Sequence, residues 1–309
     1  MKGTVLKSTG SNYTVRLENA EIAECVLRGK MRLGDLKVTN PVAVGDFVEV
    51  ETDDVSGQRV ICKVEERNNY IIRKSPKHRN ARHVLAANLD QAALVCTVVK
   101  PRTAPGFIDR FILSAEAYHI PVILIFNKQD VLTKEKDQIK QESLIELYEG
   151  LGYPCYKISA KDPATIAEVQ KALENKTTLL SGHSGSGKST LANALLPELG
   201  IATREISNFS QKGTHTTSFA EMHELGKDSW LIDSPGIKEL GILNVEPSEV
   251  SHYFVEMRDE LEACKFHNCK HISEPGCRII EMLESGEVAE TRYLSYLSMV
   301  DDAESTMSY

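Results

Sequence analysis

Residues Gly182 to Ser189 form a segment whose residue types could bind phosphate. They read GHSGSGKS and fit the pattern of glycine, any four residues, glycine, lysine, then serine or threonine. The apolar segment TTLL precedes the motif and STLANALL continues from it, so we predict a strand, a loop and a helix. In such a loop, backbone N–H groups surround phosphate oxygens, Lys188 neutralises the β and γ phosphates, and the Ser189 hydroxyl binds Mg²⁺. The predicted nucleotide contacts in this segment are Gly182, His183, Ser184, Gly185, Ser186, Gly187, Lys188, Ser189 and Thr190.

A second motif, Asn127-Lys128-Gln129-Asp130, follows the apolar run VILIF. This places it at the carboxyl end of a predicted strand, where open α/β sheets bind ligands. The motif resembles the NKxD element of GTPases, in which the aspartate accepts hydrogen bonds from guanine N1–H and N2–H, a pair that adenine does not offer. The resemblance implies that Asn127 and Lys128 brace the base and the phosphate loop. It also implies that Ser159-Ala160-Lys161 is the partner element touching guanine O6, so GTP or GDP is the predicted ligand.

A third motif, Asp233-Ser234-Pro235-Gly236, follows the apolar segment WLI. It resembles the DxPG element of GTPases, which implies that Asp233 holds Mg²⁺ through water and that the Gly236 N–H meets the γ phosphate. In Ras-like GTPases the phosphate loop comes first and the base-reading motifs come last. Here the base-reading motifs at 127 and 159 precede the phosphate loop at 182. The chain is therefore predicted to be circularly permuted.

This order of motifs closely resembles one bacterial family, the ribosome small-subunit-dependent GTPase A, over essentially the whole chain. The resemblance extends to an N-terminal β-barrel pattern and a C-terminal cysteine cluster. It implies a GTP hydrolase that binds the small ribosomal subunit and its rRNA, acts in late maturation of the subunit, and is stimulated by it. One alternative is a nucleotide-dependent RNA-binding switch whose hydrolysis is incidental. A P-loop kinase is a further alternative, against which Asp130 argues.

The residue after the DxPG motif cannot position the water that attacks GTP. Many GTPases carry glutamine there, whereas this chain has Ile237, which has no polar group. Residues 212–217 read KGTHTT and resemble the family's KGxHTT switch, which carries a threonine for Mg²⁺ and a histidine proposed to act on the water. The resemblance assigns the water to His215 and Mg²⁺ to Thr217, with Thr216 as the alternative.

Three cysteines and a histidine lie close together near the C-terminus. Cys264, Cys269, His271 and Cys277 fall within fourteen positions, and three thiolates with one imidazole are a standard tetrahedral zinc set. Four protein ligands leave no open position, so we predict one structural Zn²⁺. His267 is a rival ligand, but His271 matches the place of the histidine in the family pattern. The other cysteines are scattered, as expected of buried thiols in a cytoplasmic protein.

The elements that must hold these motifs predict a multidomain α/β protein of 309 residues. Short alternating strands punctuated by glycines predict an all-β, OB-like barrel over 1–66. Apolar strands alternating with helix-length segments predict a circularly permuted P-loop GTPase α/β domain over 86–245, and the acidic remainder, 246–309, predicts a helical zinc-binding module. The apolar run Ile120 to Phe126 is far shorter than the roughly 20 residues of a membrane helix. We therefore expect a cytoplasmic monomer with no membrane partner.

Residues 67–85 are predicted to be a basic linker. The chain has a net charge of −8, but residues 1–83 carry +4, so contact with a polyanion should be local to the N-terminal part. A basic stretch beside a small barrel resembles the way OB folds bind structured RNA through phosphate contacts. The expected rRNA contacts are Arg73, Lys74, Lys77 and Arg79, and the alternative is a solvated linker that makes no such contact.

The DxPG motif is followed within about ten residues by the predicted zinc-binding module. A nucleotide-dependent shift of this motif would pull directly on the module. The sequence therefore suggests the hypothesis that the γ phosphate sets the orientation of the C-terminal module.

Overall fold

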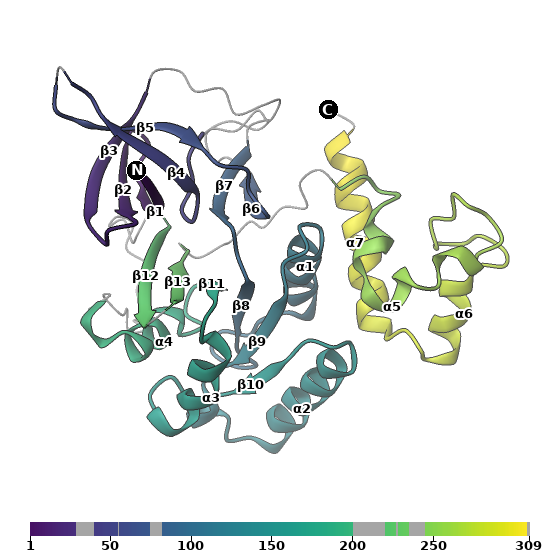
Figure 1. The fold of residues 1–309 in the computed structure, drawn as a ribbon. Coiled ribbons are helices and arrows are strands. Elements are labelled where there is room, and N and C mark those ends of the chain that lie inside the picture. Colours follow the sequence, from purple (N-terminus) through teal and green to yellow (C-terminus); the bar gives the residue numbers. More distant parts are fainter. Residues whose placement is uncertain are drawn as a thin grey trace.

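The computed structural model describes residues 1–28, 40–54, 56–74, 82–199, 220–226, 228–234 and 245–307, without the side chains of 73, 74, 82, 199, 306 and 307. One sheet of eleven strands joins the N-terminal barrel to the central α/β part (Figure 1). In sheet order its strands are β10 (Cys155–Lys157), β9 (Val122–Phe126), β8 (Gln91–Cys96), β11 (Thr177–Gly182), β13 (Ser229–Asp233), β12 (Glu221–Gly226), β1 (Lys2–Ser8), β2 (Asn12–Leu17), β3 (Ile22–Leu27), β5 (Arg59–Val64) and β4 (Phe47–Thr52).

The first five strands close into a barrel. β1 pairs with both β2 and β4, and β3 runs parallel to β5, so the hydrogen-bonded strands form a ring. Burial alternates along the strands: in β2, Tyr13, Val15 and Leu17 point into the core while the residues between them are partly exposed. This alternation is the sequence signal that predicted the barrel. A closed barrel of five strands is consistent with an OB fold.

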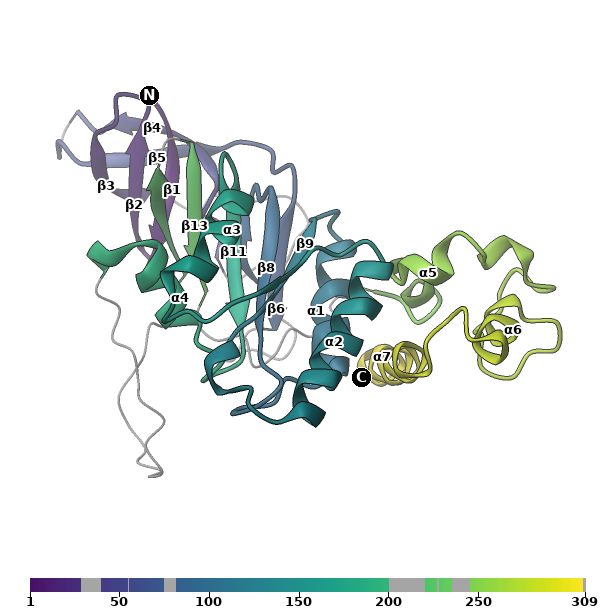
Figure 2. The ribbon, with the colours of Figure 1, turned by 90° about the horizontal axis from the view of Figure 1, so that it is seen from below.

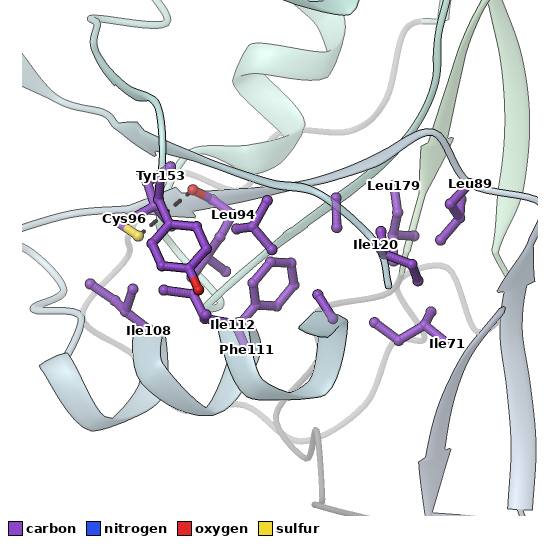
Figure 3. Close-up of a cluster of buried hydrophobic side chains, with 14 of the residues drawn as sticks. Ile71, Leu89, Leu94, Cys96, Ile108, Phe111, Ile112, Ile120, Tyr153 and Leu179 are labelled. Atoms are coloured by element: carbon purple, nitrogen blue, oxygen red, sulfur yellow. Dashed lines mark hydrogen bonds between the residues drawn. The ribbon is translucent and has the colours of Figure 1, made fainter. Parts of the chain in front are cut away.

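Helices cover both faces of the central sheet (Figure 2). They are α1 (Pro105–Glu116), α2 (Glu135–Gly150), α3 (Pro163–Leu173) and α4 (Lys188–Leu195), with short 3₁₀ turns η1 (Gln129–Val131) and η2 (Pro197–Leu199). On one face Phe111 and Ile112 of α1 pack against Leu94 of β8, as Figure 3 shows. On the other face Val169 of α3 and Leu191 of α4 belong to a second core cluster. The predicted parallel α/β domain is thus present.

Two features of the fold were not predicted from the sequence. Strand β12 lies antiparallel to β13 and joins the sheet to β1 of the barrel. The segment predicted to be a linker contains an antiparallel hairpin, β6 (Tyr70–Lys74) and β7 (Arg82–Ala87). Its apolar residues, such as Ile71 and Val84, are buried. Because this segment has many basic residues, its short strand pattern was not recognised in the sequence.

The C-terminal part is helical, as predicted. Its elements are η3 (Val250–Tyr253), α5 (Val255–Arg258), η4 (Leu261–Ala263), α6 (Arg278–Ser285) and α7 (Glu290–Met307). Helix α7 lies beside α1 (Figures 1 and 2), and Leu113 of α1 shares an apolar core with Phe254, Tyr296 and Met299. Among the residues described, no helix is both long and apolar enough to cross a membrane.

Candidate nucleotide-binding site and metal centre

The turn after β11 has the strand, loop and helix order that the phosphate-binding motif requires. β11 ends at Gly182 and α4 begins at Lys188. Gly185 and Gly187 have φ angles of 82° and 93°, a left-handed backbone that favours glycine. At Gly187 a Cβ would lie 2.2 Å from the side-chain nitrogen of Asn127, so a larger residue would not fit. A tight turn that enters a helix in this way presents backbone N–H groups to an anion.

Lys188 and Asp233 meet because their strands are neighbours in the sheet. β11 and β13 run parallel, with Leu180 opposite Asp233. The Lys188 ammonium contacts the Asp233 carboxylate and donates to the Ser234 carbonyl at 2.5 Å. Both charged side chains are about nine-tenths buried. The structure thus brings the predicted phosphate-neutralising lysine into contact with the predicted Mg²⁺-binding aspartate.

Asn127 connects the base-reading motifs to the phosphate loop. Its amide donates to the Ser186 carbonyl at 2.9 Å. Its Oδ1 accepts the N–H groups of Lys128 at 2.7 Å and Ala160 at 2.9 Å. Asn127 is 4% exposed. Its side chain thus joins its own segment to two others, at Ala160 and Ser186, that are distant in the sequence. This role follows from the position of the motif at the carboxyl end of β9.

Lys128 braces the phosphate loop from outside. It has a left-handed backbone, with φ of 73°, directly after β9. Its ammonium donates to the Gly185 carbonyl at 2.6 Å and also contacts the Lys100 carbonyl. Burial lowers the pKa of Lys128, while the nearby Asp130 opposes that shift. The predicted bracing of the phosphate loop by this residue agrees with these contacts.

Asp130 lies at the open side of the same site. Its carboxylate accepts a hydrogen bond from the Ser159 hydroxyl at 3.0 Å, and the Lys161 ammonium is 4.0 Å away. The Asp130 side chain is 37% exposed. A carboxylate has about four lone-pair positions, so Ser159 can orient it while acceptor positions still face solvent. This arrangement suits recognition of paired N–H donors on a base.

A contact that sequence analysis missed comes from residues 97–104, which follow β8. The N–H of Thr97 donates to the Thr103 hydroxyl at 3.0 Å, and the N–H of Thr103 donates to the Thr97 carbonyl at 2.7 Å, which closes this loop. Its Pro101 ring lies 3.4 Å from where a Cβ on Gly185 would be. The one available signal was the position of the loop at the carboxyl end of a strand next to β11.

Several predicted residues lie outside the part of the chain that the structure describes. They are His215, Thr216, Thr217 and Gly236 of the nucleotide site, Lys77 and Arg79 of the basic segment, and the side chains of Arg73 and Lys74. Their roles stay predictions.

The four predicted metal ligands come together in the C-terminal part. Their ligand atoms all lie within 4.8 Å of one another, and His271 Nδ1 is 3.5 Å from Cys264 Sγ and 3.4 Å from Cys277 Sγ. Tetrahedral Zn²⁺, with bonds of about 2.3 Å to sulfur and about 2.0 Å to nitrogen, would separate N and S by about 3.5 Å. Cys269 completes the set. The residues present therefore fit a tetrahedral metal ion.

The surrounding residues hold this cysteine-rich loop in shape. The Tyr293 hydroxyl donates to the His271 carbonyl at 2.7 Å. Burial alone would raise the pKa of Glu274, but its carboxylate accepts the backbone N–H groups of Lys270, Ile272 and Ser273, which lower the pKa to about 2. Burial lowers the pKa of His271, which favours the neutral imidazole that a metal requires. The rival His267 is exposed and outside the ligand group.

The phosphate loop follows the base-reading motifs along the chain, and all of these motifs meet at one edge of the sheet. This combination defines a class of protein, the circularly permuted GTPases. The chain belongs to the RsgA GTPase family. The family model for the RsgA GTPase matches residues 64–243, and that for the RsgA N-terminal domain matches residues 2–58. The predicted family and the predicted GTP-hydrolysing activity are thus confirmed.

Relatives and solved structures agree over almost the full length. The chain is 47% identical over 305 residues to "Small ribosomal subunit biogenesis GTPase RsgA 2" of Bacteroides thetaiotaomicron, covering 98% of this chain and 97% of the relative. It is similar to the crystal structure of YjeQ from Thermotoga maritima, with a TM-score of 0.77, 36% identity and 98% of each chain covered. It is also similar to YloQ, described as a circularly permuted GTPase, with a TM-score of 0.74, 26% identity, and 98% and 95% covered.

Proposed function

We propose that this chain binds the small ribosomal subunit and hydrolyses GTP to GDP and phosphate during late maturation of the subunit. Its relatives are named as GTPases of small ribosomal subunit biogenesis, which supports this proposal. The choice of guanine rests on Asp130, while the observation that carries the proposed nucleotide site is the set of bonds made by Asn127. Its side chain joins the Ser186 carbonyl of the phosphate loop to the Ala160 N–H beside the base-reading residues. One ligand with a guanine at one end and phosphates at the other therefore fits the site.

Each end of the nucleotide has its own set of residues. Asp130 would accept the guanine N1–H and N2–H, and the other proposed guanine contacts are Asn127, Lys128, Ser159, Ala160 and Lys161. Residues 182–190 would surround the phosphates, with the Gly236 N–H at the γ phosphate. Ser189, Thr217 and, through water, Asp233 would hold Mg²⁺, which neutralises charge on the phosphates. His215 would position the attacking water, because Ile237 cannot.

The metal centre is proposed to hold structural zinc. Four protein ligands close the coordination sphere, which leaves no position for a substrate. Deprotonated thiols and a neutral imidazole are the forms that bind zinc, and burial lowers the pKa of His271, which favours its neutral form. The metal would stabilise the loop between η4 and α6 rather than take part in hydrolysis.

The partner surface is proposed to include rRNA. The basic segment around β6 and β7 carries Arg73, Lys74, Lys77 and Arg79, and lysine and arginine contact phosphates in RNA-binding barrels. A subunit-bound protein of this kind would act in the cytoplasm, and we propose that it works as a monomer. Reversing these four charges should weaken binding to the subunit and reduce its salt dependence while GTP affinity is unchanged.

The test is GTP hydrolysis by the purified chain with and without small ribosomal subunits, with ATP as a competing substrate. We expect a large increase in GTP turnover with subunits and no competition from ATP. If subunits bind but do not stimulate turnover, the chain acts as a nucleotide-dependent binding switch.

A substitution at the base-reading carboxylate sharpens this test. Asp130→Asn replaces two acceptors with one acceptor and one donor. The amide N–H₂ would face the guanine N2–H, while xanthine offers a carbonyl oxygen there. We expect the variant to lose GTP affinity and to gain affinity for xanthosine triphosphate. Glu135→Gln, an exposed change at the start of α2, is the control that should alter neither affinity. Equal loss of both nucleotides would contradict the role of Asp130.

A further inference from the structure

Phe107, in the first turn of α1, stacks on His183 of the phosphate loop. The centroids of the two rings are 3.8 Å apart and their planes are inclined by 33°. The His183 carbonyl accepts the N–H of Ser186 at 3.1 Å, so His183 begins the tight turn of the loop. The aromatic contact therefore holds the residue at which the turn of the loop begins.

The helix that carries Phe107 is held from two sides. Phe111 and Ile112 of α1 are buried in the core beneath the sheet (Figure 3). Asp109 accepts a hydrogen bond from Arg292 of α7 at 2.8 Å, and both side chains are 1% exposed. The Phe107 ring also packs against the core beneath the sheet. Because α1 is fixed in this way, the ring gives the phosphate loop a firm support.

Phe107 contacts the loop through the His183 ring and not through the backbone groups that would hold the phosphates. Backbone N–H groups of the loop are the groups that bind phosphate, whereas Phe107 contacts a side chain of the loop. Pro101 lies against Gly185 on the neighbouring part of the same loop. Residues after β8 thus contact the loop at two places, and only the contact of Phe107 with His183 pairs two aromatic rings.

We propose that Phe107 is a positioning residue of the nucleotide site, which acts through His183 and holds the phosphate loop in its binding shape. The inference rests on the proposed nucleotide site. An aromatic pair contributes an amount equivalent to about a two- to tenfold change in affinity. The β phosphate occupies the loop in both nucleotides, so loss of the stack weakens GDP and GTP binding equally. The value of kcat at saturating GTP changes less than KM.

The experiment compares Phe107→Leu and Phe107→Met with Phe107→Tyr, which keeps the ring. Affinities for fluorescent GDP and for a non-hydrolysable GTP analogue are measured together with KM and kcat. We expect Phe107→Leu and Phe107→Met to bind both nucleotides about two- to tenfold more weakly, and Phe107→Tyr to bind within twofold of the unchanged chain. The control is Phe266→Leu, the same substitution at a phenylalanine of the cysteine-rich loop whose ring is 41% exposed. We expect it to leave nucleotide affinity unchanged.

Three results would overturn the inference. The first is unchanged affinity in Phe107→Leu and Phe107→Met. The second is failure of Phe107→Tyr to bind like the unchanged chain, and the third is an equal loss of affinity in Phe266→Leu. Each of these leaves the proposed function intact, because the unchanged chain still binds guanine nucleotide. Failure of the unchanged chain to bind GDP would instead contradict the proposed function as well.

Discussion

Arg292, at the joint between the central part and the C-terminal helices, is 1% exposed, whereas Lys7, at the joint with the barrel, is 39% exposed. The two joints also differ in the burial of the contacts around these two residues. The C-terminal joint has buried ion pairs beside an apolar core. At the barrel joint, the edge between β1 and β12 has exposed ion pairs beside open cavities, while Val44 of the barrel packs next to Ala86 in the core of the central part. The two attachments, on different sides of the central part (Figure 1), should therefore differ in how easily they move.

The C-terminal joint is a network around one guanidinium. Arg292 of α7 donates to both oxygens of Glu256, at 2.7 Å and 2.9 Å, and to Asp109 of α1 at 2.8 Å. The Phe254 ring lies 4.5 Å from the guanidinium carbon. Separating α7 from α1 would leave buried charges without partners, which is costly. The C-terminal helices should therefore move together with α1.

The barrel joint is made at the edge of the sheet. β1 and β12 are paired at one position, Lys7 opposite Glu221, and the two side chains form an ion pair at 3.0 Å. Arg16 lies over the Trp230 ring and is 3.6 Å from Glu224. Cavities of about 330 Å³ and 550 Å³ lie beside Trp230. Exposed pairs of this kind contribute little energy, so the edge between β1 and β12 can shift while the buried contact of Val44 with Ala86 stays in place.

This contrast bears on how the nucleotide could act on the two ends of the chain. β12 begins directly after residues 200–219, which contain the predicted KGTHTT switch. A change in that switch would reach β12 and the barrel joint first. The hypothesis that the γ phosphate orients the C-terminal module involves residues 235–244, which are outside the described residues. The contacts described favour an adjustable edge between β1 and β12 and a module fixed to α1.

Removing the metal should cause the largest change, confined to the C-terminal side. Structural zinc contributes on the order of 10 kcal/mol or more of binding free energy in small zinc domains, and Cys277 lies in the core around Tyr296. We expect chelation to abolish hydrogen-exchange protection in residues 264–285 and to leave residues 2–27 unchanged. Cys62→Ser, in the barrel, is the control that should retain the metal. Equal loss of protection in the barrel would contradict the separation of the two sides.

Arg292→Ala should have the next largest effect. It leaves the buried carboxylates of Asp109 and Glu256 without their partner, which costs about 3–5 kcal/mol of unfolding free energy. Urea unfolding followed by circular dichroism measures this change. The control is Arg110→Ala, which breaks an exposed ion pair with Asp302 between the same two helices, and about 1 kcal/mol or less is expected. If both variants lose similar stability, the buried network does not control this joint.

The ion pair at the barrel joint should have the smallest effect. A double-mutant cycle of Lys7→Ala and Glu221→Ala should give a coupling energy of about 1 kcal/mol or less, reduced further by salt. The pair is partly exposed on both sides, which is the physical reason. A salt-insensitive coupling of about 3 kcal/mol would show that the barrel is held as firmly as the C-terminal helices.

The sequence predicts what depends on local patterns. Three of the sequence signals each span only a few residues: the glycines of the phosphate loop, the apolar run before Asn127 and the spacing of the cysteines. The structure has the corresponding elements where they were expected. The short strands of the barrel follow from alternation alone. The predicted domain boundaries and the roles of His215 and Thr217 stay predictions.

The contacts that the sequence did not predict are long-range. Asp109 and Arg292 are separated by 183 positions, and a charged residue in a helix is usually solvated. The stack of Phe107 on His183 and the pairing of β12 with β1 likewise join distant segments. Their partners become neighbours only after the sheet forms. Charge in the segment predicted to be a linker hid the apolar positions of β6 and β7.

The most direct test compares hydrogen exchange in GDP with that in a non-hydrolysable GTP analogue. The account predicts that strands β1 and β12 at the barrel joint change protection between the two nucleotides. Helices α1 and α7 should keep the same protection in both, because the phosphate loop is occupied in each state and the Arg292 network stays intact. A change in α7 with none in β12 would contradict the account and favour control of the C-terminal module by the γ phosphate.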